Sequence, residues 1–127
     1  PLIRIPSARG TATRLELRNP DPSCNPYLAL AAILSAGLDG IEKRIEPVPP
    51  VNGNIYEMTN EQRAEEGIDS LPESLERAVY ELEKSQFMRE VLGDHIFEKF
   101  VLAKKEEWEA YRKTVSQWEV EQYLKKY

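Results

Sequence analysis

The sequence is poor in the side chains that build disulfides and zinc sites. Its 127 residues include one cysteine, Cys24, and one histidine, His95. A lone cysteine excludes an internal disulfide framework and suits a reducing compartment, and we expect Cys24 to be buried as a small apolar side chain. No cysteine or second histidine completes a metal set with His95, so we predict a structural or solvent-exposed role for it.

Long apolar runs and glycine-rich phosphate loops are also missing. No stretch approaches the roughly 20 apolar residues that span a bilayer, and no basic-then-apolar leader stands at the start. Neither a zinc motif nor a nucleophile elbow is present. We therefore expect a cytoplasmic protein with no membrane partner. The length suits one modest domain, and a start at Pro1 rather than methionine suggests a piece of a longer chain.

Positive charges are outnumbered by negative ones overall, 17 to 22, but they are concentrated at the start. The net charge is −5, yet the first 18 residues hold four arginines, Arg4, Arg9, Arg14 and Arg18, against the single acidic residue Glu16. The planar guanidinium binds phosphate or carboxylate through two parallel hydrogen bonds. Because the acidic remainder would repel a polyanion, we do not expect nucleic acid as a partner. A small anion held by the arginines fits this distribution.

Two short strands are predicted within PLIRIPSARG and TRLELR, joined by a loop around residues 7–12. Side chains alternate between the faces of a strand, so the charged residues of TRLELR share one face. That row consists of Arg14, Glu16 and Arg18. If the strands pair with their apolar faces on the same side, Arg4 joins the row.

The charged row has two readings. It could be a solvated cross-strand ladder of ion pairs, which contributes little to stability. It could also be one wall of a site in which Glu16 offers a hard oxygen ligand to a divalent cation and the arginines hold an anion. One carboxylate cannot hold Mg²⁺ or Mn²⁺ alone, so the second reading requires ligands from outside this chain.

The remainder of the sequence predicts a helical bundle. Asn25 and Pro26 are a good N-cap and first residue for a helix over residues 26–45 that is apolar on nearly all sides. Such a helix is central and buried in a complete protein, and it exposes apolar area when excised. A second helix with an apolar stripe is expected to run to the vicinity of Gly93, where Asp94 caps the longest helix.

Three capping boxes mark further helix starts, at Thr59 with Gln62, Ser70 with Glu73, and Ser116 with Glu119. The apolar stripes after Ser70 and Asp94 are Leu75, Ala78, Val79 and Leu82, followed by Phe97, Phe100, Val101, Trp108 and Tyr111. Trp108 and Trp118 are interpreted as core or interface anchors. Tyr56, in the preceding loop, is expected to pack beneath that loop.

Five ordered segments resemble the C-terminal region of bacterial type I glutamine synthetases: IRIP, TRLELR, DPSCNPYLALAAILSAGLDGI, NIYEM and WEVEQYLKKY. The resemblance covers essentially the whole chain, and R-x-E-x-R followed by NPYLALA is its most specific element. It implies an α+β, mainly α fold over residues 1–127. In that fold residues 1–18 are a strand pair of the active-site sheet, and residues 19–127 are a helical region with a C-terminal assembly helix.

The same resemblance implies an enzyme that joins ammonia to glutamate with ATP, through γ-glutamyl phosphate, with Mg²⁺ or Mn²⁺. Glu16 resembles the glutamate that ligates the ion nearer the nucleotide phosphates, and Arg18 the arginine that contacts substrate glutamate and the transferred phosphoryl group. Arg4 resembles the residue that holds the ATP γ-phosphate, and Arg14 an arginine near the nucleotide phosphates. Arg9 lies in the nucleotide-side loop without an assigned role.

Modification and assembly are implied as well. Tyr56 occupies the place of a tyrosine that is adenylylated in enteric members, although the following EMTNEQ differs from the enteric pattern and we do not expect the modification here. The last helix resembles the segment that joins two rings in the family's dodecamers. Its apolar anchors are Trp118, Val120, Tyr123 and Leu124. In some Gram-positive relatives the C-terminal end also meets a nitrogen-regulator protein.

The family's other metal ligands and its N-terminal domain have no counterpart in this sequence. We therefore expect residues 1–127 alone to lack synthetase activity. Two alternatives stay open: a non-catalytic helical module for assembly or regulator binding, and a related ligase that joins glutamate to a different amine.

Overall fold

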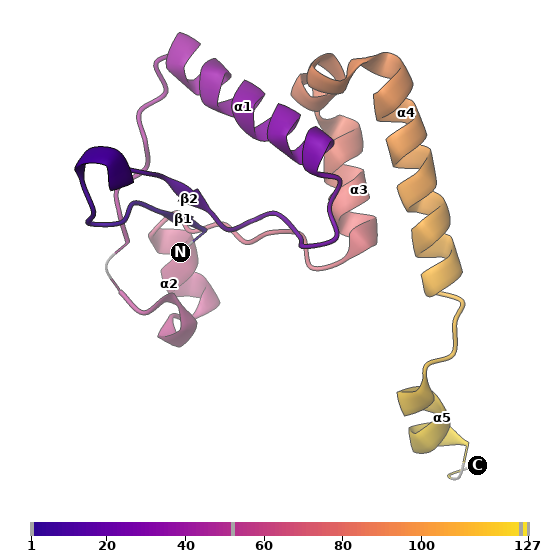
Figure 1. Ribbon diagram of the computed structural model, residues 1–127. Coiled ribbons are helices and arrows are strands. Elements are labelled where there is room, and N and C mark those ends of the chain that lie inside the picture. Colours follow the sequence, from indigo (N-terminus) through magenta and orange to yellow (C-terminus); the bar gives the residue numbers. More distant parts are fainter. Residues whose placement is uncertain (1, 52, 125, 127) are drawn as a thin grey trace. The chain divides into compact units, whose positions relative to one another are not determined.

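The computed structural model describes residues 2–51, 53–124 and 126, and it is mainly helical with two short antiparallel strands at the start (Figure 1). This confirms the predicted α+β, mainly α class. The elements are β1 (Ile3–Arg4), a 3₁₀-helix (Gly10–Ala12), β2 (Glu16–Leu17), α1 (Pro26–Glu42), a 3₁₀-helix (Ile55–Glu57), α2 (Asn60–Glu65), α3 (Leu75–Lys84), α4 (Gln86–Tyr111) and α5 (Gln117–Tyr123). They fall into two compact units, Pro1–Ile45 and Glu46–Tyr127.

The strands of the first unit are shorter than TRLELR suggests but pair as predicted. They run antiparallel with Ile3 opposite Leu17 and Arg4 opposite Glu16. Cross-strand partners share a face, so the ribbon has an apolar side and a charged side. The apolar side is largely open, since Ile3 is 56% exposed.

Helix α1 begins as predicted, because the Asn25 side chain accepts hydrogen bonds from the amides of Tyr27 and Leu28. None of its residues is buried, and its large apolar side chains lie on the surface, with Leu34 66% and Ile41 74% exposed. The predicted exposure of apolar area is confirmed. A central, buried position is not observed, because the described residues of this unit form, besides α1, only a two-stranded ribbon and one 3₁₀ turn.

The second unit has its own core where α3 packs on α4. Three apolar side chains are buried there, Val79 from α3 and Phe97 and Val101 from α4. The partly buried residues packed against them are Leu75, Leu82, Met88 and Leu92. These residues belong largely to the two predicted apolar stripes, so helical spacing located this core correctly.

Helix α4 is interrupted at Gly93, which has φ +71° and ψ 153°. An L-residue with a side chain adopts this backbone only at a cost, so glycine suits the position. Arg89 bridges the break: its Nη1 donates to carboxylate oxygens of Asp94 at 2.6 Å and Glu98 at 3.2 Å. Its guanidinium also lies over the Phe97 ring, 4.5 Å from the centroid. The predicted break at Gly93 is therefore present, but the helix expected to run up to it is divided at Ser85, where α3 ends and α4 begins.

Two of the three predicted capping boxes are present, at Thr59 with Gln62 and at Ser116 with Glu119. The prediction at Ser70 is wrong. Helix α3 begins at Leu75, and the hydroxyl of Ser74 accepts the capping bond from the amide of Arg77 at 3.1 Å. Pro72 explains the difference, because proline keeps the preceding residue out of the helical region.

Two single-residue predictions are also wrong, and a third is confirmed. Cys24 is exposed, since it lies in the turn before α1 rather than in a packed element. Tyr56 is fully exposed on its 3₁₀ turn and does not pack beneath the loop. His95 is exposed, as predicted. Throughout the described part of the chain, the helices are too short or too polar to span a lipid bilayer.

Candidate functional site

Antiparallel pairing of β1 and β2 builds the candidate site. The register sets Arg4 directly opposite Glu16, and two-residue alternation along the second strand puts Arg14 and Arg18 on the same face. A hydrogen bond from the backbone N–H of Arg18 to the carbonyl oxygen of Leu2, 2.8 Å long, extends the pairing beyond the strands. The four charged side chains predicted to share a face are therefore brought together.

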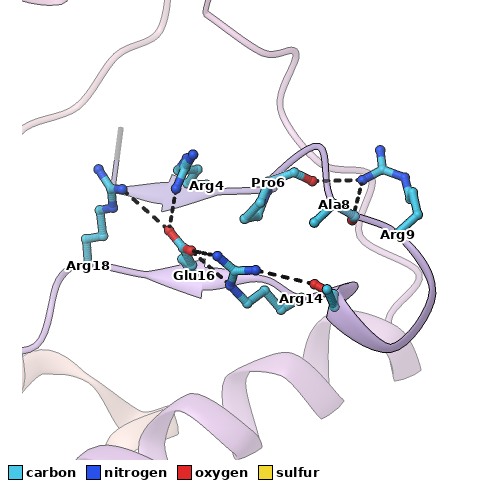
Figure 2. A network of polar contacts seen from close by, with 8 residues as sticks. Arg4, Pro6, Ala8, Arg9, Arg14, Glu16 and Arg18 are labelled. Atoms are coloured by element: carbon cyan, nitrogen blue, oxygen red, sulfur yellow. Dashed lines mark hydrogen bonds and ion pairs between the residues drawn. The ribbon is translucent and has the colours of Figure 1, made fainter.

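Three guanidinium groups converge on the one carboxylate (Figure 2). Arg4 Nη1 donates to Glu16 Oε2 at 3.1 Å, and Arg18 Nη2 reaches the same oxygen at 3.4 Å. Arg14 approaches the other oxygen, Oε1, with Nη2 at 2.7 Å and Nε at 3.0 Å. Both carboxylate oxygens are engaged, and the cluster has a surplus of positive charge.

The arginines hold the pKa of Glu16 below its ordinary value of 4.5, through the hydrogen bonds from Arg4 first and Arg14 second. Glu16 is the most shielded member, with 25% of its side chain exposed. The arginine side chains are about half exposed, at 48% for Arg4, 52% for Arg14 and 50% for Arg18. They can therefore meet a ligand from solution, and their surplus charge suits a phosphate or carboxylate group.

Arg9 has a different role from the other arginines. Its Nη1 donates to the carbonyl oxygens of Pro6 at 2.7 Å and Ala8 at 3.0 Å, so it braces the loop between the strands (Figure 2). Its hydrogen bonds to described residues all go to this loop. The sequence pattern carried no sign of this division, because it depends on how the connection turns at the 3₁₀-helix.

The fit to a divalent cation rests on Glu16 alone. A carboxylate is the hard oxygen donor that Mg²⁺ and Mn²⁺ prefer. Over residues 2–51, 53–124 and 126, no three His, Cys, Asp or Glu side chains lie close enough to hold a metal. Glu16 has the donor chemistry for one ligand of such a site, and its assignment as a metal ligand stays a prediction, since the other ligands would have to come from outside this chain.

Tyr56 belongs to the other unit, on the 3₁₀-helix Ile55–Glu57. Asn54 caps this turn: its side-chain oxygen accepts from the Tyr56 amide at 3.2 Å, and its amide nitrogen donates to Glu57 at 2.7 Å. The phenol is wholly accessible. An accessible hydroxyl is one requirement for covalent modification. The prediction that Tyr56 is not adenylylated stays a prediction.

Taken together, three arginines and one partly shielded carboxylate on the ribbon form a positively charged cluster that is the candidate anion-binding site. Comparison with known proteins identifies the family of the chain. Residues 1–123 match the family model described as the glutamine synthetase catalytic domain. The chain belongs to this family.

Named relatives agree with that assignment. The chain is 59% identical over 123 residues to a glutamine synthetase of Thermotoga maritima, a match that covers 97% of this chain and 28% of that protein. It is 50% identical over 127 residues to glutamine synthetases of Staphylococcus epidermidis and Staphylococcus aureus, covering 100% of this chain and 28% of each relative. The chain therefore spans little more than a quarter of the length of these relatives.

Proposed function

We propose that the protein to which this chain belongs is a glutamine synthetase that forms glutamine from glutamate, ammonia and ATP. The observation that carries the proposal is the convergence of Arg4, Arg14 and Arg18 on Glu16, within a segment matched by the family's catalytic domain. In the reaction, a γ-carboxylate oxygen of glutamate attacks the γ-phosphorus of ATP, and ADP leaves. Ammonia then attacks the carbonyl carbon of γ-glutamyl phosphate, phosphate leaves, and the nitrogen derived from ammonia loses a proton to give the amide.

The site residues have separate roles in this proposal. Mg²⁺ or Mn²⁺, when bound, neutralises charge on the phosphates, and Glu16 contributes one carboxylate ligand to it. Arg4 binds the γ-phosphate of ATP, and Arg14 binds oxygens of the nucleotide phosphates. Arg18 orients the substrate carboxylate and stabilises the phosphoryl group as it moves. Fixed cationic donors of this kind stabilise charge that develops in the transition state.

The remaining assignments extend the same proposal to the whole chain. Residues 1–18 contribute to the active-site sheet, and residues 19–127 are a helical region that ends in an assembly helix. Trp118 on α5 and Leu124, the residue after this helix, are 62% and 76% exposed and supply apolar anchors for homo-oligomer contacts. A cytoplasmic location and a nitrogen-regulator partner at the C-terminal end belong to this proposal too.

Family membership does not favour a purely non-catalytic assembly or regulator-binding module. A ligase for a different amine remains the second candidate, because the residues that select ammonia lie largely outside this chain. The amine is therefore the variable that the experiment must change.

The test is an assay of the complete protein with glutamate, ATP and Mg²⁺, offered ammonia or methylamine. We expect glutamine and ADP to form in equal amounts, with ammonia strongly preferred. ADP release that follows only methylamine would replace the proposal by the second candidate. Purified residues 1–127 serve as the matched control and should show no glutamine formation above background, since one carboxylate cannot assemble the metal site.

A further inference from the structure

A short helical segment, residues 86–92, lies between two breaks in the helical backbone (Figure 1). On one side Ser85, with φ −80° and ψ 98°, ends α3 and caps α4. On the other side stands Gly93, with φ +71° and ψ 153°, and the helix resumes beyond it. Because the backbone leaves the helical region at both residues, each of them can act as a hinge for this segment.

The segment has little of its own to hold it in place. Isolated helices shorter than about 12 residues are marginal in water, and this segment is well below that length. It contributes Met88 and Leu92 to the core, both only partly buried, whereas the buried residues of α4, Phe97 and Val101, lie beyond Gly93. Segments with few buried apolar contacts open locally at the lowest free energy.

Arg89 supplies the contacts that tie the segment to the rest of α4. Its Nη1 donates to Asp94 Oδ1 at 2.6 Å and to Glu98 Oε1 at 3.2 Å, and its guanidinium lies 4.5 Å from the ring centroid of Phe97. The Arg89 side chain is 35% exposed, less than either carboxylate, and the Phe97 residue beneath it is 2% exposed. These contacts all cross the break at Gly93, so they are lost if the segment swings away.

We propose that residues 86–92 form a lid on the apolar core of α3 and α4, and that Arg89 is the latch that holds this lid closed. Opening turns the segment about Ser85 and Gly93 while α3 and the long part of α4 stay folded. It takes the guanidinium off the Phe97 ring and uncovers an apolar ring face. The inference goes beyond the proposed function and does not depend on it.

A simpler account makes Arg89 an ordinary surface ion pair. Exposed pairs contribute little to stability, and the segment would then open only when the whole hairpin of α3 and α4 unfolds. Hydrogen exchange separates the two accounts, because the urea dependence of exchange reports the surface that each opening exposes. A lid exposes little surface, whereas unfolding of the hairpin exposes all of it.

The test is hydrogen exchange of the 127-residue chain at rising urea concentration, followed residue by residue with NMR. The backbone amides of residues 89–92 are compared with those of Val79 and Val101 in the core. We expect the lid amides to exchange faster than the core amides. Their urea dependence should be at least about twofold shallower, because the lid opens on its own.

The variants are Arg89→Gln and a matched control, Arg77→Gln. Arg77 also pairs with a carboxylate, that of Glu81 at 3.5 Å, and lies 5.1 Å from the ring centroid of Tyr80, but these partners share one unbroken helix. We expect Arg89→Gln to speed exchange of the lid amides about tenfold, from the loss of two ion pairs and one cation–π contact. Arg77→Gln should leave these amides within about twofold of the wild type.

The second arm repeats the exchange in 1 M NaCl, which screens exposed charges. The lid amides of the wild-type chain should exchange about threefold faster than at low salt, whereas those of Arg89→Gln should not change. Circular dichroism checks that each variant folds. If Arg89→Gln does not fold, the urea and salt dependence of the wild-type chain decide the question.

Three results would each overturn the inference. The first is that residues 89–92 exchange with the same urea dependence as Val79 and Val101. The second is that Arg89→Gln and Arg77→Gln change the exchange of the lid amides alike, and the third is that salt leaves the wild-type lid unaffected. None of these results depends on glutamine formation, so the inference and the proposed function fail or stand separately.

Discussion

The α3–α4 hairpin and the β1–β2 ribbon are held together by different physics. The hairpin buries Val79, Phe97 and Val101 in a shared apolar core. The ribbon instead joins strands of two residues each, has an open apolar side and concentrates its contacts in exposed ion pairs. Apolar burial drives folding, whereas exposed ion pairs contribute little to it.

The contrast shows which region depends on its surroundings. A two-stranded ribbon has marginal stability on its own and leaves strand edges unpaired. The region that carries the candidate chemistry is therefore the one that needs the rest of the protein, whereas the hairpin supplies its own support. This agrees with a chain that spans 28% of the length of its relatives.

The largest stability effect is expected from Phe97→Ala. Phe97 is 2% exposed, and its loss should lower the free energy of unfolding of the hairpin by about 3 kcal/mol. Urea denaturation followed by far-ultraviolet circular dichroism measures this change. The matched control is Ile96→Ala, its neighbour on the same helix, which is 46% exposed and should cost less than about 1 kcal/mol. If Phe97→Ala and Ile96→Ala lowered the free energy of unfolding equally, apolar burial would not be what distinguishes the stability of the hairpin from that of the ribbon.

A second effect concerns the uncovered face of α1. Leu34 and Ile41 are 66% and 74% exposed, so we expect the isolated chain to self-associate. The double variant Leu34→Gln with Ile41→Gln should weaken association about tenfold or more, and the exposed Ala36→Gln should leave it nearly unchanged. Sedimentation velocity at rising concentration gives the measurement. A strictly monomeric wild type at high concentration would contradict the expectation.

The smallest expected effect concerns the pKa of Glu16 in the ion-pair network of the ribbon. The folded pKa of Glu16 lies below its ordinary 4.5, so its ion pairs stabilise the ribbon fully above that value and lose their contribution as the pH falls through the folded pKa. Carbon-13 NMR titration of the carboxyl group measures the midpoint. Arg4→Ala should raise it, because Arg4 is the largest cause of the shift. Arg9→Ala should leave the midpoint of Glu16 unchanged. A midpoint that is the same in Arg4→Ala and in the wild type would contradict the ion-pair network.

Local patterns predicted the parts of the fold that local physics controls. The Asn25 cap, the capping boxes at Thr59 and Ser116 and the stripe that contains Val79 and Phe97 all follow from hydrogen bonding and helical period. The start of α3 was misplaced because the restriction imposed by Pro72 outweighs the Ser70 capping pattern. The exposure of Cys24 and Tyr56 could not be inferred from local sequence, since it depends on which elements pack around these residues.

The candidate site was predictable to a similar degree. Alternation along TRLELR placed Arg14, Glu16 and Arg18 on one face, and pairing brought Arg4 to them as predicted. Alternation could not reveal that three arginines together engage both oxygens of one carboxylate. It also could not reveal that the Arg9 side chain donates to carbonyl oxygens of the loop. Those features depend on the rotamers and turn geometry of the folded ribbon.

The most direct test of the central claim compares Glu16→Gln with Glu65→Gln in the complete protein, measured as glutamine formed from glutamate, ammonia and ATP. Both variants remove one negative charge, but only Glu16 belongs to the arginine cluster. The proposed metal-ligand role predicts a loss of about a hundredfold or more for Glu16→Gln with assembly retained, and near wild-type activity for Glu65→Gln. Full activity in the Glu16→Gln protein would contradict the claim that this ribbon is a wall of the active site.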